Sequence, residues 1–282
     1  MSMLLFGATG HLVRTKLRHR MYGAGFRDVK YVSRTRRDQN TQRSWFTPDD
    51  ELPQTDVTYF AVNSTTIPYL IDKIPHDTRL CVEKPVGKDY ESCLELMKHL
   101  DDRDVVFVDH YLCKNIPAIG NPKSIKDIYV TIHETADVED RIHSFAEMGI
   151  VRDFIQNHVL MVVGKMIGGI ETIEPFSKEN CVVDYYPGYS GPLDAPTAVT
   201  CSTTCLGGNT TIHVDIAKRA ERDTFQIILF DHQENCQVFH PSRHNDAYMD
   251  VLQRCLEGGE RVEIFPSRDD VLRCWELVED IL

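Results

Sequence analysis

Residues 104–114 read Asp-Val-Val-Phe-Val-Asp-His-Tyr-Leu-Cys-Lys, and this stretch decides the expected fold. Its first half is a short apolar run rich in β-branched residues, which is typical of a strand buried on both faces of a parallel sheet. Its second half turns polar at Asp109, His110, Tyr111 and Lys114. In an open α/β sheet, ligands bind outside the carboxyl ends of the strands, so we expect these side chains to line a binding crevice.

Four further apolar runs precede this strand and alternate with helix-forming segments. They cover residues 3–6, 29–32, 56–62 and 79–82. Five strands that alternate with helices predict a doubly wound parallel sheet. The polar residues 38–55 are expected to form a loop with at most one short helix.

The first predicted strand ends in Gly7-Ala-Thr-Gly-His-Leu12, and a helix-forming segment follows. A glycine turn between a strand and a helix is a site where backbone N–H groups hold a pyrophosphate. A turn without a ligand is the alternative. The second strand ends in Ser33-Arg34-Thr35-Arg36-Arg37, and Arg at this position suits the 2′-phosphate of NADP better than the ribose of NAD.

After residue 115 the pattern changes to antiparallel strands with one long helix. The helix is expected at 146–168, where Gly168-Gly169 ends it. Shorter helices are expected at 244–257 and 267–281. The predicted strands of this second half are 126–134, 196–205, 210–217, 224–230, 235–240 and 261–265.

The bulk composition is that of an ordinary globular protein. The 282 residues are 42% hydrophobic and 26% charged, which suffices for two modest domains. A formal net charge of −12 argues against general nucleic-acid binding, although a local basic pocket can still hold a small anion. The nine Cys form no CxxC pair, and no metal site is expected. We expect the cysteines to be free thiols, as in a reducing compartment. The sequence also shows no leader-like start and no long apolar run, so we expect a cytoplasmic protein that does not contact membranes.

Several motifs together resemble one family, the glucose-6-phosphate dehydrogenases. They are the glycine turn with Lys16, the segment Val82-Glu-Lys-Pro-Val-Gly87, and Asp109–Lys114. The stretch 145–158, FAEMGIVRDFIQNH, is similar to the active-site helix of that family, and 246–248 and 268–275 resemble its C-terminal helices. Members of the family are longer, so the chain resembles a shortened member. His11 and Cys113 stand where the family has an acidic residue and Gly.

The resemblance implies a role for each motif. It makes His158 the catalytic base and Asp109 the carboxylate that orients it. It implies that Lys84 contacts both substrate and cofactor, and that the Lys84–Pro85 peptide bond is cis. The other implied substrate-binding residues are His110, Tyr111 and Lys114 for a sugar phosphate, and Glu134, Asp153 and Lys218. The cofactor-binding residues expected from the glycine turn, the strand end at Arg34 and the resemblance are Gly7, Thr9, Gly10, His11, Leu12, Lys16, Arg34 and Lys84.

The residue pattern alone supports some of these roles and not others. On an ideal α-helix, Asp153 and His158 lie roughly 140° apart, so they flank one ligand only if the helix is distorted or points end-on to the site. Strand parity over 128–134 places Glu134 on the apolar face of its strand. The structural alternatives are a core position for His158, a solvent-facing Asp153 and a surface position for Lys114.

The expected fold is therefore a Rossmann-type doubly wound parallel sheet, residues 1–112, followed by an α+β domain with a mostly antiparallel sheet, residues 113–282. The resemblance implies NADP-dependent oxidation of glucose 6-phosphate at C1 to 6-phosphogluconolactone. Two alternatives stay open, namely a sugar dehydrogenase of the Gfo/Idh/MocA type, which shares a Glu-Lys-Pro segment, and a non-catalytic NADP-binding sensor or scaffold. The expected partner is a small phosphorylated sugar. A homodimer is the expected assembly, with a monomer as the alternative.

Overall fold

The computed structural model describes residues 1–34, 45–138, 142–192, 194–241, 246–257 and 264–282. The chain divides into two compact units. The first consists of Met1–Cys113 and His244–Val271, and the second of Lys114–Arg243 and Leu272–Leu282.

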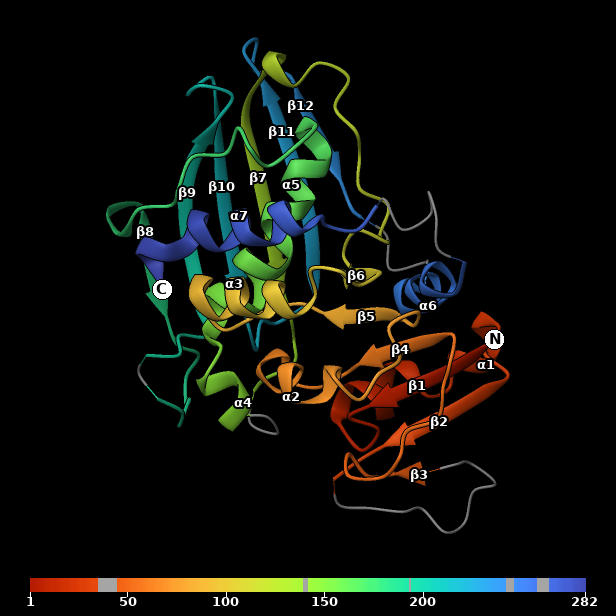
Figure 1. The fold of residues 1–282 in the computed structure, drawn as a ribbon. Helices are drawn as coiled ribbons and strands as arrows, with labels where there is room; N and C mark the ends of the chain where they lie inside the picture. Colours follow the sequence, from red (N-terminus) through yellow and green to blue (C-terminus); the bar gives the residue numbers. More distant parts are fainter. Residues whose placement is uncertain (35–44, 139–141, 193, 242–245, 258–263) are drawn as a thin grey trace. The chain divides into compact units, whose positions relative to one another are not determined.

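A six-stranded parallel sheet forms the centre of the first unit (Figure 1). Its strand order, β3-β2-β1-β4-β5-β6, is the order typical of dinucleotide-binding sheets. The chain reverses its direction of winding between β1 and β4, and ligands bind at that point in such sheets. The strands are β1 (Ser2–Phe6), β2 (Asp28–Val32), β3 (Trp45–Phe46), β4 (Val57–Phe60), β5 (Arg79–Glu83) and β6 (Val105–Val108).

Alternating side chains of these strands support two separate layers of helix. Met3 and Leu5 of β1 join one core cluster with Leu252 of a helix far along the chain. Phe6, the next residue after Leu5, points the other way and stacks on Phe60, with ring centroids 5.1 Å apart. The helical segments of this unit are η1 (Val13–Leu17), α1 (Met21–Ala24), η2 (Ser64–Thr66), α2 (Pro68–Ile71), α3 (Tyr90–His99) and α6 (Ala247–Glu257).

The second unit is built on a mixed, mostly antiparallel sheet in the order β12-β11-β7-β10-β9-β8. Among the described strands of this second sheet, β7 and β10 pair in parallel and all other neighbours pair antiparallel. The strands are β7 (Ile125–His133), β8 (Cys181–Asp184), β9 (Ala198–Cys205), β10 (Thr210–Ala217), β11 (Thr224–Asp231) and β12 (Cys236–Phe239).

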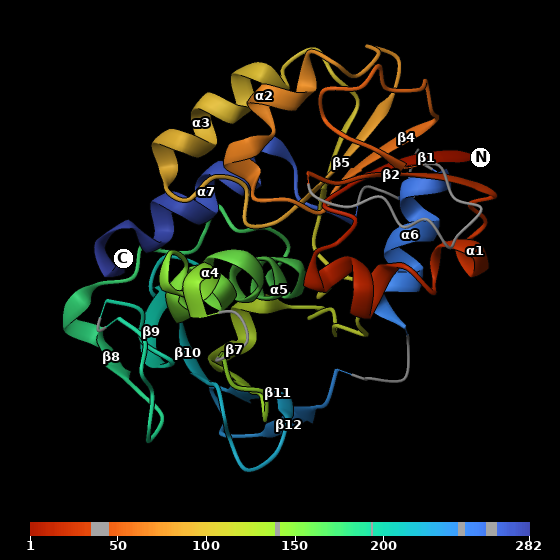
Figure 2. The same cartoon turned by 90° about the horizontal axis from the view of Figure 1, so that it is seen from below.

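One face of this sheet is covered by a long helical segment (Figures 1 and 2). It starts after α4 (Ile142–Ala146) and runs through η5 (Val151–Val159) into α5 (Leu160–Ile167). Gly168, with φ of +94°, ends it as predicted. The remaining helical segments are η3 (Pro122–Ser124), η6 (Lys178–Asn180), α7 (Arg268–Val278), which crosses the boundary between the units, and η8 (Glu279–Ile281).

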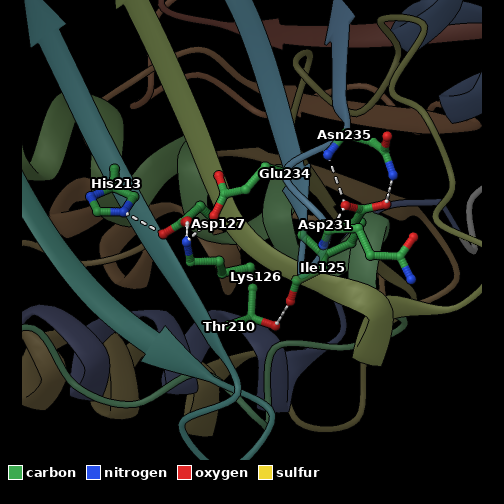
Figure 3. Close-up of polar contacts among 9 residues, drawn as sticks. Ile125, Lys126, Asp127, Thr210, His213, Asp231, Glu234 and Asn235 are labelled. Atoms are coloured by element: carbon green, nitrogen blue, oxygen red, sulfur yellow. Dashed lines mark hydrogen bonds and ion pairs between the residues drawn. The ribbon is translucent and has the colours of Figure 1, made fainter.

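Polar contacts close the end of the sheet where β7 begins (Figure 3). Asp231 accepts hydrogen bonds from the backbone N–H groups of Gln233 and Asn235 and so fixes the β11–β12 hairpin. On the same sheet, His213 Nε2 of β10 and Asp127 Oδ1 of β7 are joined by a 3.0 Å hydrogen bond. These contacts hold the strand register and are partly exposed.

Most predicted elements are present, and there are four differences. The expected loop over residues 38–55 contains a short strand, because Trp45–Phe46 (β3) pair in parallel with β2 and Trp45 stacks on Tyr31; residues 38–44 lie outside the described residues. The predicted strand at 261–265 is wrong where the structure describes it, because Ile264 and Phe265 form a turn; residues 261–263 lie outside the described residues. The prediction omitted β8, because its last three residues are all exposed and the strand lacks alternation. It also kept the segment 244–257 in the second half of the chain, whereas α6 shares a core with β1 in the first unit.

Candidate functional site

The glycine turn after β1 has a geometry that only glycine tolerates. Gly7 has φ of +76°, and a Cβ there would lie 2.1 Å from the carbonyl oxygen of Ala61. Gly10 N–H donates to the Gly7 carbonyl at 2.7 Å, which closes the turn. Gly7 follows β1 and Ala61 follows β4, so the close approach lies where the winding reverses. A tight turn at this point fits the phosphates of a dinucleotide.

The other expected cofactor residues lie on the same unit with different exposure. Thr9 and Ser33, from the ends of β1 and β2, are joined by a 3.2 Å hydrogen bond between their hydroxyl groups. Arg34, His11 and Lys16 are exposed, while Leu12 packs against the core. Arg36 and Arg37 lie outside the described residues.

Two charged side chains meet at the ends of β5 and β6. Lys84 Nζ and Asp109 Oδ2 are 3.4 Å apart, and both side chains are fully buried. The second carboxylate oxygen of Asp109 accepts the Tyr111 N–H at 3.0 Å. The Lys84–Pro85 peptide bond is cis, as the resemblance implied. Because a buried pair is costly unless each charge is balanced, Lys84 and Asp109 depend on each other.

Glu83 adds a second carboxyl group to this edge. It accepts a short hydrogen bond from the Tyr59 hydroxyl. Burial raises the pKa of the Glu83 carboxyl to about 8, the Tyr59 hydrogen bond opposes this rise, and the Asp109 carboxylate adds to it. Glu83 has no role among the sequence-based predictions, because the partial burial of a glutamate at a strand end cannot be recognised from sequence.

The residues after β6 are held by α6. His110 stacks on Tyr248 with ring centroids 4.7 Å apart, and the Tyr248 hydroxyl lies 3.4 Å from His110 Nδ1. Cys113 is buried, and its thiol hydrogen-bonds Asp250. Burial, followed by the charge of Asp250 and this hydrogen bond, raises the pKa of Cys113. The Cys113 side chain therefore fills a position in the core, and this packing accounts for a cysteine where the family has Gly.

The second unit brings three of its predicted residues into one cluster. Lys218 Nζ lies 2.6 Å from Glu134 Oε2 and 3.1 Å from Asp153 Oδ2. The same Nζ lies 4.3 Å from the ring centroid of Phe154. Lys218 is only 4% exposed, so its charge is balanced by the two carboxylates. The structure thus excludes the alternative of a solvent-facing Asp153, and it shows Phe154 as a contact that sequence analysis missed.

The helix that carries Asp153 and His158 is distorted, which is one of the two conditions under which these residues could flank one ligand. Over η5, backbone hydrogen bonds join residues five apart, as in Leu160 N–H to the Ile155 carbonyl. In such a wide helix, residues i and i+5 follow each other on consecutive turns. Asp153 and His158 therefore share a side, unlike on an ideal helix. His158 is 5% exposed and its ring lies edge-on to Phe154, 6.4 Å between centroids.

The remaining substrate residue of this unit is Lys114. Its Nζ lies 4.8 Å from the ring centroid of Phe225, and the residue is partly buried. The implied pairing of Asp109 with His158 joins residues of different units and stays a prediction.

Among the described residues, no group of three or more His, Cys, Asp or Glu is placed to hold a metal ion. In the same part of the chain, no helix is long and apolar enough to cross a membrane.

The architecture defines a class, namely proteins with a dinucleotide-binding parallel sheet and a mixed-sheet unit with a polar cluster. Two family models match the chain, "Glucose-6-phosphate dehydrogenase, NAD binding domain" over residues 26–117 and "Glucose-6-phosphate dehydrogenase, C-terminal domain" over residues 115–178. The chain belongs to the glucose-6-phosphate dehydrogenase family. These matches do not favour the alternative of a Gfo/Idh/MocA-type enzyme.

Individual relatives agree with this assignment. The chain is 38% identical over 104 residues to glucose-6-phosphate 1-dehydrogenase of Leuconostoc mesenteroides, which covers 30% of this chain and 21% of the relative. It is 29% identical over 168 residues to glucose-6-phosphate 1-dehydrogenase 6, cytoplasmic, of Arabidopsis thaliana, covering 46% and 32%. The matched segments thus span a third or less of these relatives.

A solved structure shares the fold. Glucose-6-phosphate 1-dehydrogenase from Mycobacterium avium superposes with a TM-score of 0.82 at 16% identity, covering 99% of this chain and 91% of that chain.

Proposed function

We propose that this protein oxidises glucose 6-phosphate at C1 to 6-phosphogluconolactone with NADP as the hydride acceptor. The observation that carries the proposal is the Glu134–Lys218–Asp153 cluster on the unit that also holds His158. Two carboxylates accept hydrogen bonds from sugar hydroxyls, and an ammonium group donates to sugar oxygens. A cluster of this kind suits a polyhydroxylated ligand.

His158 is the proposed general base for the C1 hydroxyl proton. Imidazole is the side chain best suited to accept a proton near neutral pH. The proposed role of Asp109 is to hold the imidazole in one tautomer and to stabilise the cation that forms. A hydride then leaves C1, and the carbon becomes the lactone carbonyl.

The proposed site for the 6-phosphate consists of His110, Tyr111 and Lys114. A phosphate dianion needs a positive charge and hydrogen-bond donors, which these side chains supply. Tyr248 supports this role because its ring fixes the orientation of His110.

NADP fits the residues at the end of the parallel sheet. The glycine turn at Gly7 lies where the winding of the sheet reverses, the point at which such sheets bind a pyrophosphate, and Arg34 supplies the charge that a 2′-phosphate requires. Thr9, Gly10, His11, Leu12, Lys16 and Lys84 are the other proposed cofactor contacts. When bound, the nicotinamide accepts the hydride from C1. We further propose a cytoplasmic location, as in the name of the Arabidopsis thaliana relative, and a homodimer.

The test is a substrate panel with the purified chain. We expect NADPH formation with glucose 6-phosphate, a loss of at least 100-fold in kcat for His158→Asn, and a raised KM for Lys218→Met. Lys126→Met removes an exposed ion pair with Glu234 and serves as the control with unchanged activity. Oxidation of unphosphorylated sugars that is insensitive to Lys114→Ala would identify the alternative sugar dehydrogenase. Tight NADP binding without turnover of any sugar would identify a sensor.

A further inference from the structure

Two of the cysteines of the second unit face each other across neighbouring strands. In the antiparallel pair β8–β9, Cys181 is the register partner of Cys201. Directly opposite residues of an antiparallel pair project from the same face of the sheet. The two thiols are in contact, since Cys201 hydrogen-bonds Cys181.

The spacing of such a pair matches the geometry of a disulfide. Opposite Cα atoms in antiparallel strands lie about 4.5 or about 5.5 Å apart. Disulfides span Cα separations of roughly 4.4–6.8 Å. Both thiols are free in the structure, and because the two residues are register partners, a bond between them needs no change of strand register.

The two thiols differ in a way that sets the order of reaction. Cys181 is partly exposed, whereas Cys201 is only 3% exposed. The hydrogen bond from Cys201 lowers the pKa of Cys181, while the same hydrogen bond, together with burial, raises the pKa of Cys201. The thiolate is the nucleophile, and Cys181 is both the more accessible thiol and the one that ionises more readily. Cys181 is therefore the thiol that reacts first with a reagent in solution.

We propose that Cys181 and Cys201 form a reversible redox modification site that takes low-molecular-weight disulfides. The Cys181 thiolate attacks one sulfur of the small disulfide, and the other half leaves as a thiolate. Cys201 then loses its proton to solvent and attacks Cys181 Sγ, which releases the second small thiol. The two cysteines are oxidised by two electrons, and one small disulfide is reduced to two thiols.

The strands that this bond joins also frame the polar cluster. Thr197, at the start of β9, accepts the Lys218 N–H through its carbonyl at 3.0 Å. Its hydroxyl accepts the Tyr186 N–H at 2.8 Å and ties the loop between β8 and β9. A covalent link between β8 and β9 would therefore restrain the segment that holds the Lys218 backbone.

The chain contains two internal controls. Cys81 and Cys255 also hydrogen-bond each other, but both are fully buried, so reagent cannot reach them in the folded unit. Cys236 is exposed, and its register partner is Phe230 rather than a cysteine. The proposal predicts that Cys81 and Cys255 stay reduced and that Cys236 stops at a mixed disulfide.

The experiment treats the full-length reduced protein with oxidised glutathione, blocks the remaining thiols and maps the products by mass spectrometry without reduction. Chymotrypsin cleavage after Tyr185 and Tyr189 separates the two cysteines, and fragmentation distinguishes Cys201 from the buried Cys205. We expect a Cys181–Cys201 cross-link that dithiothreitol reverses, and a higher Tm for the cross-linked form.

The variants show the order of reaction. Cys201→Ser is expected to accumulate glutathione on Cys181, whereas Cys181→Ser leaves Cys201 free and abolishes the rise in Tm. The wild-type protein decides the matter even if a variant fails to fold. A glutathione adduct that persists on Cys181 beside a free Cys201, or no reaction at Cys181 while Cys236 reacts, would overturn the proposal.

Discussion

At the scale of single residues, the close approach of the chain after β1 to the chain after β4 requires a glycine at position 7. We expect Gly7→Ala to destabilise the protein by about 1–2 kcal/mol from the positive φ alone, and by more because its Cβ would lie 2.1 Å from the Ala61 carbonyl oxygen. Thermal unfolding measures this effect. Gly120→Ala is the control, since nothing lies within 4 Å of a Cβ there. Equal melting temperatures for the two variants would contradict the geometry.

The buried carboxyl of Glu83 should make stability depend on pH. Its folded pKa is raised from 4.5 to about 8, so its contribution is fully present below about pH 4.5 and is lost as the pH rises through 8. We expect the difference in unfolding free energy between wild type and Glu83→Gln to fall on the order of 1 kcal/mol per pH unit across this window. Urea unfolding at several pH values measures it.

Tyr59→Phe provides the matched control for this effect. The Tyr59 hydroxyl lowers the Glu83 pKa by donating a hydrogen bond. Its removal should therefore move the upper end of the pH window higher. A difference between wild type and Glu83→Gln that is flat with pH would mean that the carboxyl ionises as freely in the folded as in the unfolded chain.

At the scale of elements, α6 shows how a segment late in the sequence completes an early core. Val251, Leu252 and Cys255 are fully buried with Met3 and Leu5 of β1. We expect Leu252→Ala to cost about 2–5 kcal/mol in unfolding free energy. Leu94→Ala, on the exposed side of α3, should change it by less than about 0.5 kcal/mol. If denaturant unfolding gives the two variants similar stability, α6 does not belong to that core.

The wide helix η5 is the element that departs most from what its sequence indicates. Its apolar and polar residues fit an ordinary helix, and hydropathy does not reveal the hydrogen bonds between residues five apart. In this wide helix Asp153 and His158 lie nearer to one side than on an ideal helix, and Asp153 contacts Lys218, which lies 65 residues further on (218 minus 153). Wide turns of this kind are frequent at functional sites.

At the scale of the whole molecule, the protein carries a net negative charge, yet we propose that it binds the anionic cofactor NADP through the local positive charge of Arg34. We expect NADP to raise the Tm more than NAD at equal concentration, because ligand binding to the folded state adds RT ln(1 + [L]/Kd), about 2.7 kcal/mol at 100 times Kd. Arg34→Ala should remove this preference and leave NAD binding intact. Lys98→Ala, on the exposed face of α3, is the control. Equal shifts for NADP and NAD with the wild-type chain would refute the NADP preference.

The sequence by itself determined the parallel sheet, the antiparallel character of the second half and most strand bounds, because hydrophobic alternation and glycine turns are local signals. Motif resemblance further indicated the family, the cis Lys84–Pro85 bond and the residues that cluster at Lys218. Only the tertiary structure decided the membership of α6, the partners of Glu83 and Cys113, the Cys181–Cys201 contact and the distortion of η5. Each of these depends on burial and on contacts between residues far apart in the chain, which local patterns do not encode.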